Sequence, residues 1–583
     1  MFGLLLPLLM TLAPTPPPAP AAAWRTPFEA GNGNTTATYA ECLAFYKKLA
    51  AAYPNACTLR PAGATDCGEP LHEFVISPGN DADASSPRRA GRRVVFIQIG
   101  IHPGEPEGID ASMMLARDLL QHADYQKLLA DVTVVIVPAY NIDGMLNRTA
   151  TSRVNQNGPA EAGFRGNARH LDLNRDYVKQ DSRNARSFAA LFGRWRPEVF
   201  VETHTSNGAD YQYTMTLIAT QHSKLAPALG QYLQTALLPA LYAGMAARGN
   251  GMVPYVDFEG RTPESGLRGF LDLPRYSTGY AALFNTIGFM PETHMLKPYP
   301  ARVRATYEFL ATVLETVHTQ AAALGQARAA AAAALAAQTR FALAWELDEQ
   351  QVETIPFNGY EARTEASAVS GLPRLRYDRA APFTRPVPYR NTYRPTLAIA
   401  APTAYVIPAA WGEVIERLQC AGAVLHRLEK PLTGPLETYY IADFKTSTAP
   451  FEGHYLHRDV QLEARFEAQG TAPAGDYLLR LAEQGPARRY VVETLEPQGP
   501  DSFFAWGAFD SILQQKEHFS DYVFEDVAAE ILRRQPALRA GLAARQVADP
   551  AFAADAQAQL EWVYQRSEYH EAGHNRYPVR RLR

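Results

Sequence analysis

Three short, continuously apolar runs separated by helical patterns constrain the fold of this 583-residue chain more than any other feature. The runs are RRVVFIQIG (92–100), DVTVVIVPAY (131–140) and PEVFVETHT (197–205). Their length and their β-branched and aromatic residues are typical of strands buried on both faces. Helical periodicity at 108–122 and 183–195 lies between them. This alternation predicts an α/β fold, with a central sheet flanked by helices.

Beyond this region the chain changes character. A long helix is predicted to begin near Ala301, and the Ala-rich segment 320–350 is interpreted as a helical connector between domains. From 351 to 583, short strands with turn residues about every ten positions predict a β-rich C-terminal domain of unknown role. We expect its aromatic segment 501–513 to form core, with a binding groove as the alternative.

Residues 1–23 are predicted to be a secretory signal peptide. Residues 1–12 are nearly all apolar, and the Pro/Ala stretch that follows ends in small residues suited to cleavage. No Lys or Arg precedes the apolar run, and a Pro/Ala tail on a cytosolic protein is the alternative. Because the run is shorter than the ~20 residues that span a bilayer, we expect an exported protein, periplasmic or extracellular, without a membrane span.

Composition and charge limit the partners. The chain is 47% hydrophobic and 20% charged, as expected of a globular protein with a sizeable core. A net charge of −4 and the lack of a long basic run argue against a nucleic-acid partner. Four cysteines are too few for a disulfide scaffold and lack paired zinc-ligand spacing. A Cys57–Cys67 bridge and free thiols are both open.

Two of the predicted strands lead to potential metal ligands. The run at 92–100 is followed directly by His102 and Glu105, and the run at 197–205 carries His204 near its carboxyl end. Open α/β sheets place their sites at the carboxyl ends of strands, so we expect these side chains to meet. Two histidines and a glutamate with one open position are typical of a catalytic zinc site. Hydrogen-bonding or capping roles for Glu105 and His204 are the alternative.

Five motifs fall in the order found in the zinc carboxypeptidase family. They are GIHPGE (100–105), NIDG (141–144), LDLNRDY (171–177), VETHT (201–205) and GFMPETH (288–294). Residues 24–319 therefore resemble a bacterial member of that family. The resemblance implies a catalytic domain with a mixed eight-stranded sheet between helices.

The resemblance also implies a metal site and its chemistry. His102, Glu105 and His204 match the ligands of one zinc ion per chain. Asp172 matches the carboxylate that orients the first zinc histidine, a contact that fixes the tautomer of the ring. Glu292 matches the general base, which takes a proton from the zinc-bound water and passes it to the leaving amine.

Further residues match positions that bind the substrate. Asn174 and Arg175 match the pair that binds the terminal carboxylate, a task suited to the planar guanidinium. Arg153 matches the arginine that polarises the scissile carbonyl. Arg148 and Arg165 compete with it for this role.

Two departures from the family pattern concern substrate contacts. Gly104 stands where the digestive enzymes have an arginine between the first two ligands, so upstream subsites are expected to differ. The mobile tyrosine that covers the site in the family corresponds to Tyr276 or Tyr280, and the side-chain pocket lies in this same segment.

The implied function is that of a zinc metallocarboxypeptidase, which hydrolyses C-terminal residues from peptides by Glu-assisted attack of zinc-bound water. A second hypothesis is a peptidoglycan stem-peptide amidase or endopeptidase, because related members act on such peptides. The third is a catalytically inactive binding module. The presence of Glu292, Arg175 and all three ligands argues against the third, since inactive relatives commonly lack one of them.

Overall fold

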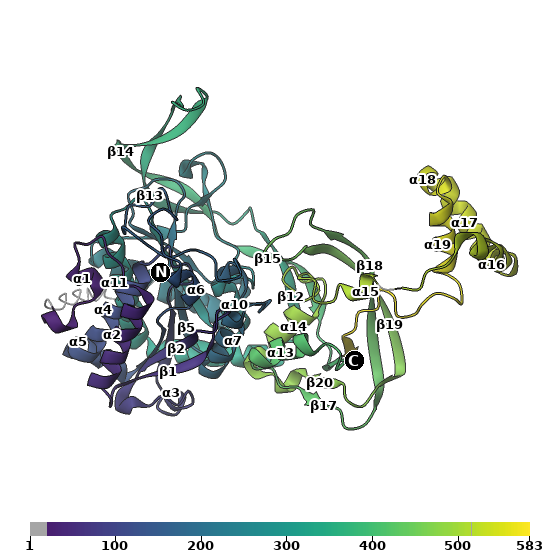
Figure 1. The fold of residues 1–583 in the computed structure, drawn as a ribbon, viewed down its shortest axis with the longest axis horizontal. Helices are drawn as coiled ribbons and strands as arrows, with labels where there is room; N and C mark the ends of the chain where they lie inside the picture. The colour runs from purple at the N-terminus through teal and green to yellow at the C-terminus, as the bar shows by residue number, and fades with distance from the viewer. Residues whose placement is uncertain (1–19, 515) are drawn as a thin grey trace, which may run out of the picture.

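The computed structural model describes residues 20–514 and 516–583 (Figure 1). The predicted signal peptide, 1–23, lies outside the described residues except for its last four positions. Within the described part of the chain, no helix combines the length and the hydropathy that a membrane crossing requires.

A mixed sheet, nine-stranded in the described residues, organises the first half of the chain, 20–337. Four central strands run parallel, and antiparallel neighbours flank them on both sides. The order is β1 (Cys57–Ala64), β2 (Pro70–Ile76), β4 (Val132–Val137), β3 (Arg93–Gln98), β5 (Val199–Glu202), β11 (Ile287–His294), β7 (Met215–Ala219) and β8 (Val253–Pro254), with β6 (His204–Ser206) paired to β11. The predicted mixed α/β sheet is confirmed, with one strand more than the eight expected.

Both faces of the sheet are buried. Along β3, Val95 and Ile97 point into one core and Val94 and Phe96 into the other, because successive side chains of a strand alternate. The first core is covered by α2 (Tyr39–Ala52), α4 (Glu107–Gln121) and α11 (Tyr299–Thr319). The second is covered by α7 (Arg183–Trp195) and α10 (Ser277–Leu283). Burial on both sides explains why these runs are apolar throughout.

The Ala-rich segment is part of the core rather than a free connector. Helix α12 (Ala321–Ala337) buries Leu324 and Ala331 in the first core and packs on α8 (Pro227–Tyr232). The rest of the predicted connector 320–350 contains β12 (Arg340–Leu347), which pairs with β15 (Tyr393–Ala400). Small alanine side chains let α12 approach its neighbour closely, which a pattern of helical propensity alone does not reveal.

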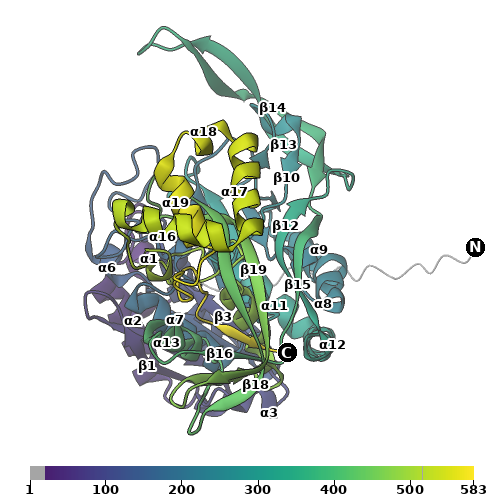
Figure 2. The ribbon, with the colours of Figure 1, turned by 90° about the vertical axis from the view of Figure 1, so that its right-hand side faces the viewer.

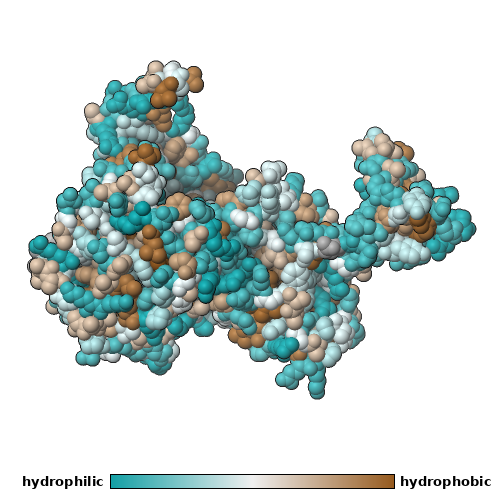
Figure 3. Space-filling model, in the orientation of Figure 1, coloured by the Kyte–Doolittle hydropathy of each residue, from teal (hydrophilic) through white to brown (hydrophobic). Residues whose placement is uncertain are grey.

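The C-terminal half, 338–583, is β-rich up to about residue 480, as predicted. A long hairpin of β13 (Glu353–Ala366) and β14 (Pro373–Arg390) projects from the molecule (Figures 1 and 2). Val369 and Leu372 are exposed in its turn, where Figure 3 shows apolar surface. A second sheet, six-stranded in the described residues, contains β17 (His426–Arg427), β20 (Tyr477–Arg480), β16 (Ala404–Ile407), β21 (Arg580–Leu582), β18 (Leu432–Thr446) and β19 (His457–Ala472).

After residue 480 the chain is mainly helical, which the sequence analysis did not predict. Helix α13 (Gly412–Cys420) precedes this part, and α14 (Arg488–Leu495) begins it. A group of helices stands apart from the rest in Figure 1 and has a small core of its own. It consists of α16 (Asp521–Arg534), α17 (Pro536–Ala548), α18 (Pro550–Ala553) and α19 (Ala556–Tyr564).

The two halves share the second hydrophobic core. Tyr490 on α14 packs against Tyr280 and Phe284 of the first half, with ring centroids 5.9 and 5.7 Å apart. Phe504 and Trp506 from the aromatic segment 501–513 are buried in the same core, so its predicted core role is confirmed. The C-terminal half therefore supports the sheet of the first half directly.

All four cysteines are free thiols. Cys57 is buried, and its Sγ faces the backbone carbonyls of Leu49 and Tyr53. Cys67 is exposed in the turn between β1 and β2, where its Sγ lies 2.7 Å from Oδ1 of Asp143. The Cys57–Cys67 bridge left open above is not formed, because the two thiols face different partners.

Candidate active site

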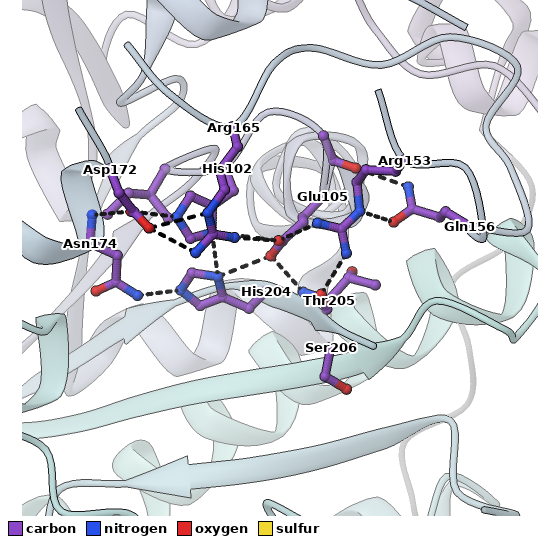
Figure 4. Close-up of polar contacts among 12 residues, drawn as sticks. His102, Glu105, Arg153, Gln156, Arg165, Asp172, Asn174, His204, Thr205 and Ser206 are labelled. Atoms are coloured by element: carbon purple, nitrogen blue, oxygen red, sulfur yellow. Dashed lines mark hydrogen bonds and ion pairs between the residues drawn. The ribbon is translucent and has the colours of Figure 1, made fainter. Parts of the chain in front are cut away.

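The loop after β3 and the short strand β6 bring the three predicted ligands together. Gly100, with a φ of 71°, turns the chain out of β3, and His102 and Glu105 follow before α4 begins. The pairing of β3 with β5 places His204 beside this loop. The three side chains are buried, and their ligand atoms lie within 4.8 Å of one another (Figure 4).

The donor atoms of this group converge. Nδ1 of His102 lies 3.1 Å from Nδ1 of His204, which in turn lies 3.0 Å from Oε2 of Glu105. Two imidazole nitrogens and a carboxylate oxygen aimed at one point form a set that suits zinc and leaves a coordination position open. The residues therefore fit the metal that the sequence analysis expected.

Each histidine has its other ring nitrogen held by a carboxylate. Nε2 of His102 lies 2.7 Å from Oδ1 of Asp172, the position that the resemblance implied. Nε2 of His204 contacts Oε2 of Glu202, which is fully buried. A proton held on Nε2 leaves Nδ1 free to bind a metal. Glu202 was missed, although its place two residues before His204 in an extended run was a usable signal.

The ligands shift one another's protonation equilibria. Burial alone would raise the pKa of Glu105, but Arg153 and His102 outweigh it and hold that pKa well below its usual value. Burial would lower the pKa of His204, whereas the neighbouring Glu202 and Glu105 raise it well above its usual value. A metal ion bound here would take the place of the proton on Nδ1 of His204, while Nε2 keeps its proton toward Glu202.

Glu292 lies next to this group without belonging to it. The parallel pairing of β6 with β11 sets Glu292 opposite His204, and its carboxylate is not among the clustered ligand atoms. Burial raises the pKa of Glu292 to about 7, with a further rise from Glu105 and Glu202 that His204 opposes. A cation bound nearby would favour the ionised form. This half-buried carboxylate lines the same cavity as the three ligands.

Two of the three arginines considered reach the site. Nη1 of Arg153 donates to Oε1 of Glu105 at 2.7 Å. Arg165 donates to Oδ2 of Asp172 through Nε and Nη2, at 3.1 and 2.8 Å. Arg148 donates instead to backbone carbonyls, at 3.3 to 3.5 Å, and does not line the site.

Gly104 leaves room for Arg153. A Cβ atom at position 104 would come within 3.0 Å of Cδ of Arg153 and 3.1 Å of the backbone oxygen of Gly163. A side chain at this position would therefore require Arg153 or the backbone at Gly163 to shift by a few tenths of an ångström.

The three ligands, Glu292, Arg153 and Arg165 line a cavity of about 220 Å³. Asn174 and Arg175 lie on its wall, and the guanidinium of Arg175 stacks over the ring of Tyr276 at 4.6 Å. Tyr280, the other tyrosine considered, is fully buried in the second core and does not reach the cavity. Tyr255 was missed by sequence reasoning; it lines the cavity, and burial and the charge of Glu292 raise the pKa of its phenol.

The C-terminal half also touches the site. Glu452, in the loop between β18 and β19, accepts a hydrogen bond from the backbone N–H of Asp172 at 2.8 Å. The same loop contains His454, whose Nε2 lies 2.5 Å from Oδ2 of Asp181. The C-terminal half thus helps to fix the position of the segment that carries Asp172. No sequence pattern pointed to this contact.

We expect Glu202→Gln to weaken zinc binding about 10- to 100-fold, because glutamine keeps the size of the side chain but loses the charge that orients His204. Competition with a chromogenic chelator measures the affinity. Glu198→Gln is the matched control, since Glu198 is also buried but accepts from the backbone N–H of Val94, away from the site. Equal zinc affinity in Glu202→Gln and the unchanged protein would refute the role.

The chain is similar to several known carboxypeptidases. A family model described as zinc carboxypeptidase matches residues 42–235, which include all three ligands. Carboxypeptidase 2 of Trichophyton rubrum is 21% identical over 434 residues, covering 71% of this chain and 73% of the relative. Probable carboxypeptidase 2 of Arthroderma benhamiae is 21% identical over 419 residues, covering 68% and 72%. A solved metallo-carboxypeptidase from Burkholderia cenocepacia is 18% identical with a TM-score of 0.37, covering 49% and 70%.

Proposed function

Because the chain carries a zinc carboxypeptidase domain and is a zinc metallopeptidase, we propose that it removes C-terminal residues from peptides. The observation that carries this proposal is the position of Arg175 on the wall of the cavity that the ligands and Glu292 also line. A guanidinium binds a carboxylate through two parallel hydrogen bonds. A free C-terminus held there, with Asn174 beside it, leaves the last peptide bond near Glu292 and the ligands.

The proposed mechanism assigns proton transfer to Glu292. The three ligands would hold one zinc ion per chain, which when bound polarises the scissile carbonyl and makes a water molecule more acidic. Glu292 takes a proton from the attacking water and then delivers it to the leaving nitrogen. Its half-buried position beside His204 keeps the carboxylate at the place where both transfers occur.

Arg153 is the group proposed to stabilise negative charge on the carbonyl oxygen. Its guanidinium lines the cavity and is oriented by Oε1 of Gln156, which accepts from Nε at 2.6 Å. Arg165 lines the same cavity and is the alternative for this role, with its guanidinium donating to Asp172 through two nitrogens. A donor that is already in place when charge develops needs no reorganisation during the reaction.

Peptides are the proposed substrates, met outside the cytoplasm if the apolar start of the chain directs export. N-terminal sequencing of the natively produced protein checks the export part of the proposal. A mature chain that still begins at Phe2 would contradict it.

We expect amidation of a peptide's C-terminus to reduce cleavage of its last bond by at least ~100-fold. The amide removes the charge that Arg175 binds, and a lost charged hydrogen bond costs a few kcal/mol. Mass spectrometry of matched free-acid and amidated peptides measures the difference. In the control variant Arg175→Ala the two peptides should be cleaved at similar, low rates. Equal cleavage by the unchanged protein would instead favour the cell-wall endopeptidase hypothesis.

A further inference from the structure

A short segment, 275–277, contacts both Asn174 and Arg175, the carboxylate pair that is proposed to bind the substrate's C-terminus. The ring of Tyr276 lies under the guanidinium of Arg175, 4.6 Å away. The backbone N–H of Ser277, at the start of α10, donates to Oδ1 of Asn174 at 3.2 Å. The position of segment 275–277 therefore sets how both members of the carboxylate pair are oriented.

The first residue of this segment, Arg275, is held by Asp501 of the C-terminal half. Oδ2 of Asp501 accepts from the backbone N–H of Arg275 at 2.9 Å, and Oδ1 accepts from Nε at 2.8 Å. Nη2 of the same guanidinium lies 2.7 Å from Oδ1. Burial raises the pKa of Asp501, and the charge of Arg275 opposes that rise. A guanidinium bound through two nitrogens is fixed in direction as well as in place.

Two aromatic side chains of the C-terminal half complete the surroundings of Arg275. Its guanidinium carbon lies 4.9 Å from the ring centre of Trp506 and 5.8 Å from that of Phe451. The indole N–H of Trp506 also donates to Oδ1 of Asp501 at 3.2 Å. A guanidinium over an aromatic face gains a cation–π attraction. Arg275 thus attaches segment 275–277 firmly to the C-terminal half.

The turn that carries the carboxylate pair is attached to the same half by a separate contact. Glu452, the neighbour of Phe451, accepts from the backbone N–H of Asp172, which directly precedes the 3-10 turn Leu173–Arg175. Oδ1 of Asp172 accepts from the backbone N–H of Asn174 at 2.9 Å. The C-terminal half therefore holds both the turn and the segment on which Arg175 stacks.

We propose that Asp501 is a positioning residue for the carboxylate pair and sets how strongly the enzyme selects a free C-terminus. It acts through Arg275, which keeps Tyr276 under Arg175. The proposal rests on the function proposed above. Two parallel hydrogen bonds to a carboxylate require a correctly oriented guanidinium, and a small displacement loses much of that contact. Asp501 lies outside residues 24–319, so the C-terminal half supplies this control.

Asp501→Asn tests the proposal, because asparagine keeps the size of the side chain but loses the charge that holds Arg275. For a free-acid peptide, kcat/KM should fall at least about 10-fold, mainly through KM, since the carboxylate pair binds ground state and transition state alike. For the matched amidated peptide, kcat/KM should change less than about 2-fold, because no carboxylate is bound. The free-acid-to-amide ratio therefore falls, while zinc content stays the same.

Asp476→Asn is the matched control. Asp476 is also buried in the C-terminal half, accepts from the backbone N–H of Ala409 at 3.2 Å and does not line the catalytic cavity. It should leave the free-acid-to-amide ratio unchanged. Thermal unfolding of both variants shows whether they are folded and how far each is destabilised.

Further variants test the route through Arg275. Arg275→Met should lower the ratio as Asp501→Asn does, and adding Asp501→Asn to it should lower the ratio less than about 2-fold further, because the two residues act as one unit. Phe451→Ala decides the question if Asp501→Asn does not fold, because Phe451 is 38% exposed. It should lower the ratio about 2- to 5-fold, the worth of an exposed cation–π contact.

Three outcomes would overturn the proposal. They are a folded Asp501→Asn protein with an unchanged ratio, an equal loss for both peptides, which marks a purely structural role, and an additive loss in the double variant. If Asp501→Asn does not fold, an unchanged ratio in Phe451→Ala and Arg275→Met overturns it. Failure of the unchanged protein to distinguish free-acid from amidated peptides contradicts the proposed function instead, before any variant is compared.

Discussion

Replacing Glu292 with glutamine is expected to lower kcat/KM about 10²- to 10⁴-fold, while the zinc content stays near one ion per chain. Glutamine keeps the size of the side chain but cannot accept a proton, and general acid–base help is worth about this factor. Zinc is retained because the carboxylate of Glu292 is not among the clustered ligand atoms. Turnover of a chromogenic peptide and zinc by atomic absorption are measured on the same sample.

Glu413→Gln serves as the control for this substitution, because the side chain of Glu413 is 80% exposed and does not line the catalytic cavity. It should match the unchanged protein in both measurements. Loss of zinc from Glu292→Gln would mean that Glu292 is a ligand, and full activity would mean that another group is the base. Either result rejects the assignment.

His204→Ala is expected to lose the metal itself, with activity falling to the level of the protein stripped by a chelator. Two protein ligands would be left where a catalytic zinc site normally has three. The change also leaves the buried Glu202 without its partner, an unfavourable position for a charge. Zinc by atomic absorption and peptide turnover again provide the measurements.

The control for the metal ligand is His426→Ala, since His426 is about half exposed and pairs with Glu483 away from the site. Circular dichroism should show that His204→Ala retains its secondary structure, so that loss of zinc is not simply loss of fold. A folded His204→Ala protein with a full zinc complement would remove His204 from the ligand set.

Sequence reasoning could find the three metal ligands, because their positions follow from the strands that carry them. His102, Glu105 and His204 follow apolar runs that become neighbouring buried strands, so the ends of those strands had to meet. Glu292 was expected from the resemblance alone, and the pairing of β11 with β5 and β6 explains why it lies opposite His204. Such placements depend on local patterns and on the regular geometry of a parallel sheet.

By itself, the pattern of the sequence predicted an α/β sheet flanked by helices, the loop and strand that carry the ligands, and the aromatic core segment. The mixed strand directions and the role of Glu292 were expected only from the resemblance to the family. Whether Tyr276 or Tyr280 faces the cavity was decided by packing, because Tyr280 is taken into the core shared with Tyr490.

Only the tertiary structure decided what the C-terminal half does for the site. Glu452 meets the backbone of Asp172 across 280 positions of sequence, and Asn391 meets Gln221 across 170. Contacts of this kind depend on how the two halves dock, and neither the hydrophobic period nor the motif spacing within one segment carries that information. The packed Ala-rich helix and the shared second core depend on this docking, which is why the sequence predicted a connector and an appended domain where the structure has two halves packed together.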